Sequence, residues 1–419
     1  MNIKSQIGKT LRLPFVKNVI HTIGSKWITI AIGIIPVMLI TRGLGPVGKG
    51  EYSLIISTIG VLMQLSTFGL HTSNTYHVSK DRSSLDALFT NSVFWIAVTA
   101  TLTSLGFFLF NLLYPGEINM FKGGYIGFIV IGTFGSLSNI ISQNLNIGIN
   151  NIKQVNVYTI GAKVLTLVLV LSLYFSKNIT VRYALIIALL EFFVITFLCG
   201  RLLMRSIEKI TWTIDKELLR KTISYGLKVY IISLMAFLVV RSDIYIVKYF
   251  LGNEAVGYYS TSVQLIDQLN MLAVVVATLL LPKLTSTEDL KERHRLSKRS
   301  FKYLAILMFT MCTIGFFFSD FAIKLLFGVE FMPASITFKV LLPAIFFLAL
   351  ETSLAQYLAA NGLPKSLIWA WIATFIINLI LNVLFIPIYG TVGAAYASVI
   401  SYFSIFVFVY IIYRRGIVE

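Results

Sequence analysis

Long apolar stretches alternate with short polar segments along the whole chain. A helix that crosses a bilayer needs about 20 mainly apolar residues, because each residue adds about 1.5 Å along the helix axis. Twelve stretches meet this requirement, and each predicts a membrane-spanning helix. The predicted spans are residues 20–41, 53–76, 88–113, 124–149, 154–175, 182–204, 225–250, 257–281, 302–327, 335–360, 366–387 and 391–413.

Composition supports a lipid environment for these helices. Of the 419 residues, 57% are hydrophobic and only 13% are charged, and the mean hydropathy is +0.83. A soluble domain carries about 25% charged residues, and so few charges cannot cover a surface exposed to water. The sequence therefore predicts an all-α integral membrane protein, with about 12 transmembrane helices in two six-helix bundles around a central cavity.

Basic residues outnumber acidic residues by 35 to 18, and they gather between the apolar stretches. Lys and Arg concentrate in cytoplasmic loops of membrane proteins, so this charge does not indicate a nucleic-acid partner. Most of the basic residues fall on the side of the two termini, which predicts that both termini are cytoplasmic. Residues 1–20 predict an interfacial arm rather than a cleavable signal. Residues 205–222 and 283–302 predict amphipathic helices that contact anionic membrane lipids, with Thr213 and Ser286 as their N-caps.

Metal, cofactor and nucleotide chemistry find no support in the sequence. Cys199 and Cys312 lie inside apolar stretches, and the four histidines are scattered without the spacing of a metal site. Residues 43–48 match G-x-G-x-x-G, yet they follow no strand. They predict instead a tight turn between two helices, because glycine tolerates positive φ. No cofactor and no bound metal are expected.

Two segments of the chain resemble each other. Residues 44–53 follow the first span and residues 251–260 follow the seventh, and both contain leucine, two glycines, tyrosine and serine at the same spacing. An even number of spans per half makes such repeats parallel, and transporters built this way place a substrate cavity between the halves. The pattern predicts an N-terminal bundle over residues 1–204, a cytoplasmic amphipathic linker over 205–224 and a C-terminal bundle over 225–419.

Ionisable side chains inside the apolar stretches are the candidates for function, because an isolated charge in hydrocarbon costs several kcal/mol. Arg241 and Lys163 lie near mid-depth, whereas Lys26 and Lys228 lie nearer the cytoplasmic ends of their spans. We expect these four cations to bind an anionic substrate in a wet cavity. The alternative is that they form internal ion pairs that hold the helices together.

Acidic and amide side chains accompany these cations. Three roles stay open for them: they bind sugar, they bind a coupling H⁺ or Na⁺, or they pair with the bases. Arg241 and Asp267 fall at similar depth on consecutive spans and are placed to pair. Asn378 and Asn382, four residues apart, are expected to hold helices together. The candidates for sugar or the coupling ion are Asp243, Asp267, Glu191, Glu351, Gln143, Asn146 and Gln264, and those for the outer mouth of the cavity are Arg42 and Lys248.

Several short motifs together resemble a known family. They are the turn at residues 44–53 with its copy at 251–260, the Ser-Tyr-Gly-Leu entry to the seventh span within residues 221–227, Arg241-Ser242-Asp243, and residues 387–395 at the entry to the last span. Over nearly its whole length the chain resembles the polysaccharide-repeat flippases (Wzx type) of the multidrug/oligosaccharidyl-lipid/polysaccharide exporter superfamily. Many relatives have proline where this chain has Lys228, so no kink is expected there.

The resemblance implies a transporter and not an enzyme. Such flippases move undecaprenyl-pyrophosphate-linked oligosaccharide repeat units across the bacterial cytoplasmic (inner) membrane by alternating access, for O-antigen and lipopolysaccharide synthesis. It further implies coupling to H⁺ or Na⁺, with a polysaccharide polymerase and a chain-length regulator as partners. Arg241, Lys163 and Lys26 are then the leading candidates to hold the pyrophosphate.

Two other functions stay open on the sequence. A multidrug or small-cation antiporter of the same superfamily is favoured by the excess of acidic residues at mid-depth, because drug cations bind acidic and aromatic cavities. A membrane polymerase or glycosyltransferase would carry catalytic residues on a sizeable extracytoplasmic loop, and no loop in this sequence is long enough.

Overall fold

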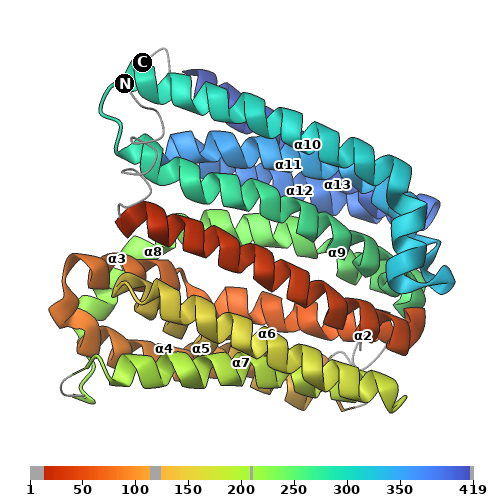
Figure 1. Ribbon diagram of the computed structural model, residues 1–419, viewed down its shortest axis with the longest axis horizontal. Coiled ribbons are helices and arrows are strands. Elements are labelled where there is room, and N and C mark those ends of the chain that lie inside the picture. Colours follow the sequence, from red (N-terminus) through yellow and green to blue (C-terminus); the bar gives the residue numbers. More distant parts are fainter. Residues whose placement is uncertain (1–13, 114–123, 208–210, 416–419) are drawn as a thin grey trace, which may run out of the picture. The chain divides into compact units, whose positions relative to one another are not determined.

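A computed structural model describes residues 14–113, 124–207 and 211–415. Within these ranges the chain forms long α-helices and two short 3₁₀ turns, and it contains no strand (Figure 1). The helices are α2 (Pro14–Thr67), α3 (Leu70–Lys80), α4 (Leu85–Leu113), α5 (Ile126–Gly148), α6 (Ile152–Phe175), α7 (Val181–Met204), α8 (Lys216–Arg241), α9 (Asp243–Thr285), α10 (Leu290–Phe327), α11 (Ala334–Ala360), α12 (Ser366–Tyr389) and α13 (Thr391–Arg415), and the 3₁₀ turns are η1 (Arg82–Ser84) and η2 (Val329–Phe331).

The predicted spans lie in helical segments. Ten helical stretches in the described part of the chain are long and apolar enough to cross a bilayer. Two of these stretches, Ile32–Thr67 and Val229–Thr285, each contain parts of two predicted spans. The expectation of an all-α membrane protein with about twelve spans is therefore confirmed.

The second predicted span is interrupted at Phe68 and Gly69, whose φ angles are 44° and 72°. Gly69 lies against Gly226 of α8, and a Cβ added to Gly226 would lie 2.9 Å from the carbonyl oxygen of Gly69. The two backbones thus approach more closely than a residue with a side chain allows. Tyr230, one turn further along α8, stacks on Phe68 with the ring centroids 5.3 Å apart. A close backbone approach and an aromatic stack therefore hold this interruption in place.

The turn expected within residues 43–48 lies at Gly45. Its φ of 65° lies outside the helical region, so α2 is kinked there. The copy of this segment bends in the same way, because Gly252 in α9 has a φ of 84°. Both turns use the positive φ that glycine adopts at low cost.

The two turns also pack against each other through matching positions. A Cβ added to Gly50 would collide with the carbonyl oxygen of Asn253, and a Cβ added to Gly257 would collide with the carbonyl oxygen of Pro46. Gly50 and Gly257 are equivalent in the two copies, as are Pro46 and Asn253. The crossing is therefore reciprocal, and it explains why both copies carry glycine at the equivalent positions 50 and 257.

The two predicted surface helices form the first turns of α8 and α10, which continue into membrane spans, and both begin later than the sequence predicted. The carboxylate of Asp215 caps α8 by accepting a hydrogen bond from the backbone nitrogen of Leu218 at 2.9 Å, and Asp289 caps α10 in the same manner. The predicted caps, Thr213 and Ser286, are therefore wrong. A carboxylate nearer to the helix start replaces them, because its negative charge also interacts favourably with the positive end of the helix dipole.

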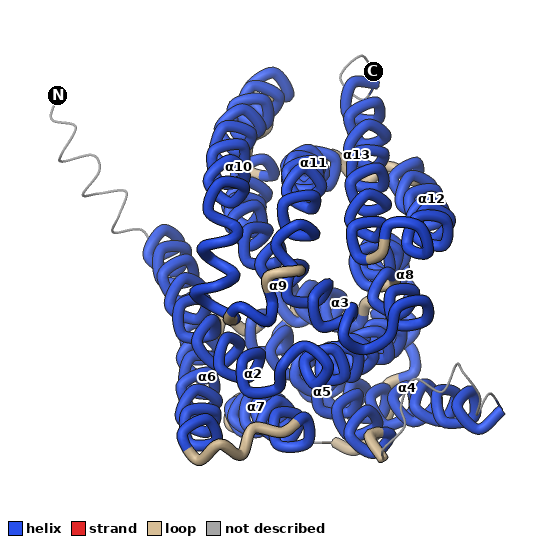
Figure 2. Tube along the Cα trace, turned by 90° about the vertical axis from the view of Figure 1, so that its right-hand side faces the viewer, coloured by secondary structure: helices blue, strands red, loops and turns tan. Residues whose placement is uncertain are grey.

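The chain divides into two compact units. The first unit comprises Met1–Gly43 and Ile55–Tyr230, and the second comprises Leu44–Leu54 and Ile231–Glu419. In the first unit α5 packs against α3, α4, α6 and α7. In the second unit α11 packs against α9, α10 and α13, and Figure 2 shows α11 between α10 and α13. One central helix thus organises the core of each unit.

Candidate functional site

Arg241, the last residue of α8, forms an ion pair with Asp267 of α9. Its Nη2 atom lies 2.7 Å from Oδ2 of Asp267, and the two side chains are 31% and 36% exposed. The pairing predicted from their similar depth is therefore confirmed. Arginine carries five N–H donors, so this bond leaves further donors for a second anion.

Helices α8 and α9 meet at Ser242, inside the predicted seventh span; this one-residue interruption, which we call the break, keeps a φ of −70° and a ψ of −27°. Asp243, at the start of α9, is only 3% exposed. One of its carboxylate oxygens accepts a hydrogen bond from the backbone nitrogen of Ile244 at 2.8 Å, and the hydroxyl of Tyr259 donates to the other. The kink at Gly252 lies between these residues and lets α9 bring Tyr259 back to Asp243. Transporters coordinate cations at such interruptions of membrane helices.

Amide and hydroxyl groups of α12 and α13 continue the polar surroundings of this break. The hydroxyl of Ser242 donates to the side-chain oxygen of Asn378 at 3.5 Å, and the amide nitrogen of Asn378 donates to the hydroxyl of Ser401 at 3.2 Å. Asn382 donates to the backbone oxygen of Asn378 at 2.9 Å. Among the described residues, the side-chain oxygen of Asn382 is buried without a hydrogen-bond partner. We call these residues the break cluster: Ser242, Asp243, Tyr259, Asn378, Asn382 and Ser401.

In the first unit, Lys163 of α6 pairs with Glu191 of α7. The distance from Nζ to Oε1 is 2.6 Å, and the side chains are 31% and 13% exposed. The other carboxylate oxygen of Glu191 accepts a hydrogen bond from the hydroxyl of Thr166 at 2.8 Å. Both charges, and both oxygens of the carboxylate, therefore have partners inside the unit.

Lys49 is a buried cation that the sequence reasoning did not select. It follows the turn at Gly45 and is only 3% exposed. Its Nζ atom donates to the side-chain oxygen of Gln264 at 3.0 Å and lies 5.7 Å from the centroid of the Tyr52 ring. Gln264, a candidate for sugar or ion binding, is thus engaged by a lysine. The available signal was the lone cation in this glycine-rich turn, since the copy has Val256 at that position.

Three further candidates lie inside their units. Asn146 is fully buried and donates to the carbonyl oxygen of Cys199 at 3.0 Å, which ties α5 to α7. Gln143 donates to the side chain of Asn139 within α5. Glu351 of α11 is 4% exposed. The contacts of Asn146 are those of a residue that holds helices together.

The remaining cations are distributed more widely. Arg42 is exposed, and Lys248 is partly exposed and close enough to Glu51 for the two charges to interact. The side chains of Lys26 and Lys228 lie outside the residues that the structure describes. Substrate binding by Lys26 and Lys228, and a place at the outer mouth of the cavity for Arg42 and Lys248, stay predictions.

Comparisons with known proteins identify the family of this chain and its relatives. Residues 15–288 match the family described as polysaccharide biosynthesis protein. A Shigella flexneri protein named "Putative O-antigen transporter" is 22% identical over 410 residues, which cover 91% of this chain and 94% of that protein.

Solved structures share the fold at low identity. The lipid II flippase MurJ, in an inward closed conformation, has a TM-score of 0.72 at 14% identity and matches 94% of this chain and 87% of its own. An inward-facing multidrug resistance MATE family transporter of the MOP superfamily has a TM-score of 0.69 at 13% identity and matches 94% of this chain and 98% of its own. The chain therefore shares the fold of these two proteins. The family match covers more than half of the chain, so the chain belongs to the polysaccharide biosynthesis protein family, as its motifs predicted.

Proposed function

We propose that this protein flips undecaprenyl-pyrophosphate-linked oligosaccharide repeat units across a bacterial cytoplasmic membrane by alternating access, with both termini in the cytoplasm. Its family and its similarity to the Shigella flexneri protein over 91% of the chain support transport of a polysaccharide precursor. The observation that carries the proposal is Arg241, a partly exposed guanidinium inside a membrane span. Guanidinium groups bind phosphate oxygens through two parallel hydrogen bonds, which suits a pyrophosphate.

A coupling cation, H⁺ or Na⁺, binds at Asp243. The charges of Arg241 and Asp267 balance each other, so Asp243 leaves the break cluster with one uncompensated negative charge. The buried side-chain oxygen of Asn382 provides an acceptor that lacks a partner among the described residues. Carboxylate, amide and hydroxyl oxygens are the ligands that hard cations such as Na⁺ prefer, and a carboxylate alone suffices for H⁺.

Cation binding and substrate binding favour each other in this scheme. Asp243 lies two residues from Arg241, so neutralising its carboxylate raises the electrostatic potential that attracts a pyrophosphate. By thermodynamic linkage, the substrate then raises the affinity for the cation by the same factor. This reciprocal effect links the occupancy of the cation site to the loading of the lipid-linked head group.

The experiment that tests the proposal separates substrate binding by Arg241 from its pairing with Asp267. Cells that lack the gene receive Arg241→Gln, Asp267→Asn or the double variant, and surface polysaccharide is measured relative to the amount of protein in the membrane. We expect Arg241→Gln to lower surface polysaccharide about 10- to 100-fold, because a hydrogen bond to a charged group contributes about 1.5–3 kcal/mol. The double variant should stay defective, because it restores charge balance but not the substrate contact.

The controls decide between transport and structure. Lys177→Gln changes an exposed cation in the turn after α6 and should leave surface polysaccharide unchanged. Recovery of transport in the double variant would show that Arg241 only balances Asp267, and would refute substrate binding at this cation. Deletion of the gene with normal polysaccharide but increased drug sensitivity would identify a drug antiporter instead.

A further inference from the structure

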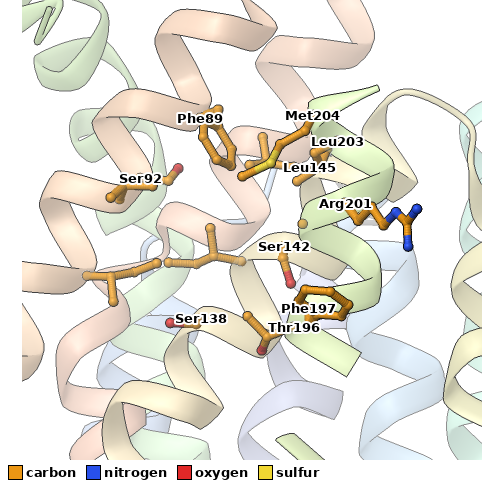
Figure 3. A pocket seen from close by; sticks show the side chains of 14 residues that line it. Phe89, Ser92, Ser138, Ser142, Leu145, Thr196, Phe197, Arg201, Leu203 and Met204 are labelled. Carbon is orange, nitrogen blue, oxygen red and sulfur yellow. The ribbon is translucent and has the colours of Figure 1, made fainter. Parts of the chain in front are cut away.

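A groove of about 400 Å³ lies in the first unit between α4, α5 and α7 (Figure 3). Its walls come from the first turns of α4, including Phe89 and Ile96, and from the last turns of α5, including Leu145. The last turns of α7 supply Phe197 and Met204. The N-terminal turns of α4 thus meet the C-terminal turns of α5 and α7, so the groove is confined to one end of the unit.

The polar side chains in this groove offer little to a polar ligand. The hydroxyl of Ser92 donates to the carbonyl oxygen of Leu88 at 2.6 Å, and that of Thr196 donates to the carbonyl oxygen of Phe192 at 2.8 Å. The hydroxyl of Ser142 likewise donates within its own helix, at 3.1 Å. Each of these three hydroxyl protons is therefore used by the local backbone, and Ser138 supplies the remaining hydroxyl of the lining. The remaining wall is hydrocarbon and aromatic, which suits an alkyl chain rather than a sugar.

The depth of the groove corresponds to one leaflet. From Thr196 to Met204 the lining segment of α7 runs for about 12 Å, at 1.5 Å per residue. The hydrocarbon core of a bilayer is about 30 Å thick, so one leaflet occupies about 15 Å. An acyl chain that enters at the C-terminal end of α7 can therefore contact the groove over most of the thickness of one leaflet.

A single cation marks the edge of this groove. Arg201 lies one turn before the end of α7, is exposed, and extends its guanidinium away from the apolar lining side chains in Figure 3. Among the residues that the structure describes, its side chain forms no ion pair. An apolar groove bounded by a cation at the end of a membrane helix matches a lipid with a hydrocarbon tail and an anionic head.

We propose that this groove binds one acyl chain of an anionic glycerophospholipid, whose phosphate pairs with Arg201. The wall is mainly hydrocarbon and aromatic and covers only one leaflet, which favours a phospholipid over the lipid-linked substrate. The site stabilises the α4–α5–α7 packing in membranes that contain anionic lipid. This lipid site does not depend on the proposed transport function.

Native mass spectrometry of the purified full-length protein tests this site with two lipids, phosphatidylglycerol and phosphatidylcholine. Gly200→Leu fills the groove, because a Cβ at Gly200 meets no atom within 4 Å and the residue belongs to the lining. We expect it to reduce the retention of both lipids. Arg201→Gln should weaken phosphatidylglycerol roughly fivefold and leave phosphatidylcholine unchanged, because one cation near the membrane surface contributes about 1 kcal/mol. Arg201→Lys should retain most of the phosphatidylglycerol.

Matched variants guard against nonspecific effects. Gly106→Leu adds the same side chain to α4, where a Cβ also meets no atom within 4 Å, but outside the groove. Arg182→Gln removes an exposed cation at the opposite end of α7. Both controls should retain phosphatidylglycerol like the unaltered protein. If Gly200→Leu and Arg201→Gln retained phosphatidylglycerol like the unaltered protein, the proposed site would be wrong. It would also be wrong if the two controls lost as much lipid as the test variants. Both conclusions hold whatever the surface-polysaccharide assay shows.

Discussion

Each unit holds an ion pair within its membrane helices, but the two pairs have different surroundings. Lys163 and Glu191 of the first unit lie in the uninterrupted helices α6 and α7, and their atoms are 2.6 Å apart. Arg241 and Asp267 of the second unit are 2.7 Å apart, and Arg241 is followed directly by the break between α8 and α9. Nearly equal distances therefore accompany different backbone environments.

The difference is one of charge balance. In the first unit one base meets one acid, and Thr166 satisfies the second oxygen of that acid. In the second unit one base meets one acid while Asp243, buried two residues away, adds a second negative charge. A balanced pair stabilises helix packing, whereas a buried charge without a counter-charge is retained where a ligand compensates it. An ion pair alone therefore does not identify a cation site. The additional buried carboxylate of Asp243 distinguishes the second unit from the first.

Asp243→Asn should produce the largest effect, because it removes the charge that distinguishes the second unit. Purified protein is heated in Na⁺ or in K⁺ and at several pH values, and surface polysaccharide is measured in cells. Na⁺ at a hundredfold excess over its Kd stabilises a protein by about 2.7 kcal/mol, and we expect this stabilisation to vanish in Asp243→Asn together with transport. Stabilisation by lower pH but not by Na⁺ would assign the site to H⁺.

Asp320→Asn is the control for this measurement. Asp320 is also an acid of the second unit, paired with Lys339 at 2.9 Å, but it is 56% exposed and lies in α10, outside the break cluster. Its loss should leave transport and the cation response unchanged. If the Asp243→Asn protein responded to cations like the unaltered chain, the assignment of the ion site to Asp243 would be wrong.

Neutralising the balanced pair should produce an intermediate effect. Lys163→Met alone leaves Glu191 without its base, and we expect a loss of about 1–2 kcal/mol of unfolding free energy, less than for a fully buried pair because Lys163 is partly exposed. Lys163→Met with Glu191→Gln should recover most of this loss, and transport should recover with it. Thermal unfolding in detergent and surface polysaccharide in cells measure the two quantities. A stable double variant without transport would instead place Lys163 in substrate binding, as the sequence first suggested.

Much of the fold follows from local sequence. Stretches of about 20 apolar residues locate the spans, and glycines at the repeated positions Gly45 and Gly252 locate two kinks. The break at Ser242 was not predicted, because no proline or glycine marks it. It is accompanied by a contact with Asn378, 136 residues away, which no local pattern reveals.

The sequence predicted the depth of the site residues within the membrane, but not the direction in which their side chains point. Counting residues from the ends of the spans placed Arg241 and Asp267 at one level, and their pairing followed. The same counting placed Asp243 and Glu351 at mid-depth, yet gave no means to find that Tyr259 donates to Asp243. Rotation of each helix about its axis decides such contacts, and it depends on the packing of the whole unit. Lys49 was missed because its turn was interpreted through its glycines alone.

The smallest effects should come from single hydroxyl groups, which allow the sharpest contrast between the units. Thr166→Val removes the hydroxyl that donates to Glu191, and Tyr259→Phe removes the hydroxyl that donates to Asp243. Each loses one hydrogen bond to a carboxylate with little change in volume, so each should lower the unfolding free energy by about 1–3 kcal/mol. Only Tyr259→Phe should also alter the cation dependence of stability and of transport, because its carboxylate belongs to the ion site. Thermal unfolding across a Na⁺ and pH series compares the two variants directly. If Thr166→Val shifted the cation response as strongly as Tyr259→Phe, the carboxylate of the first unit would also exchange a cation, and the contrast between a balanced pair and an ion site would be wrong.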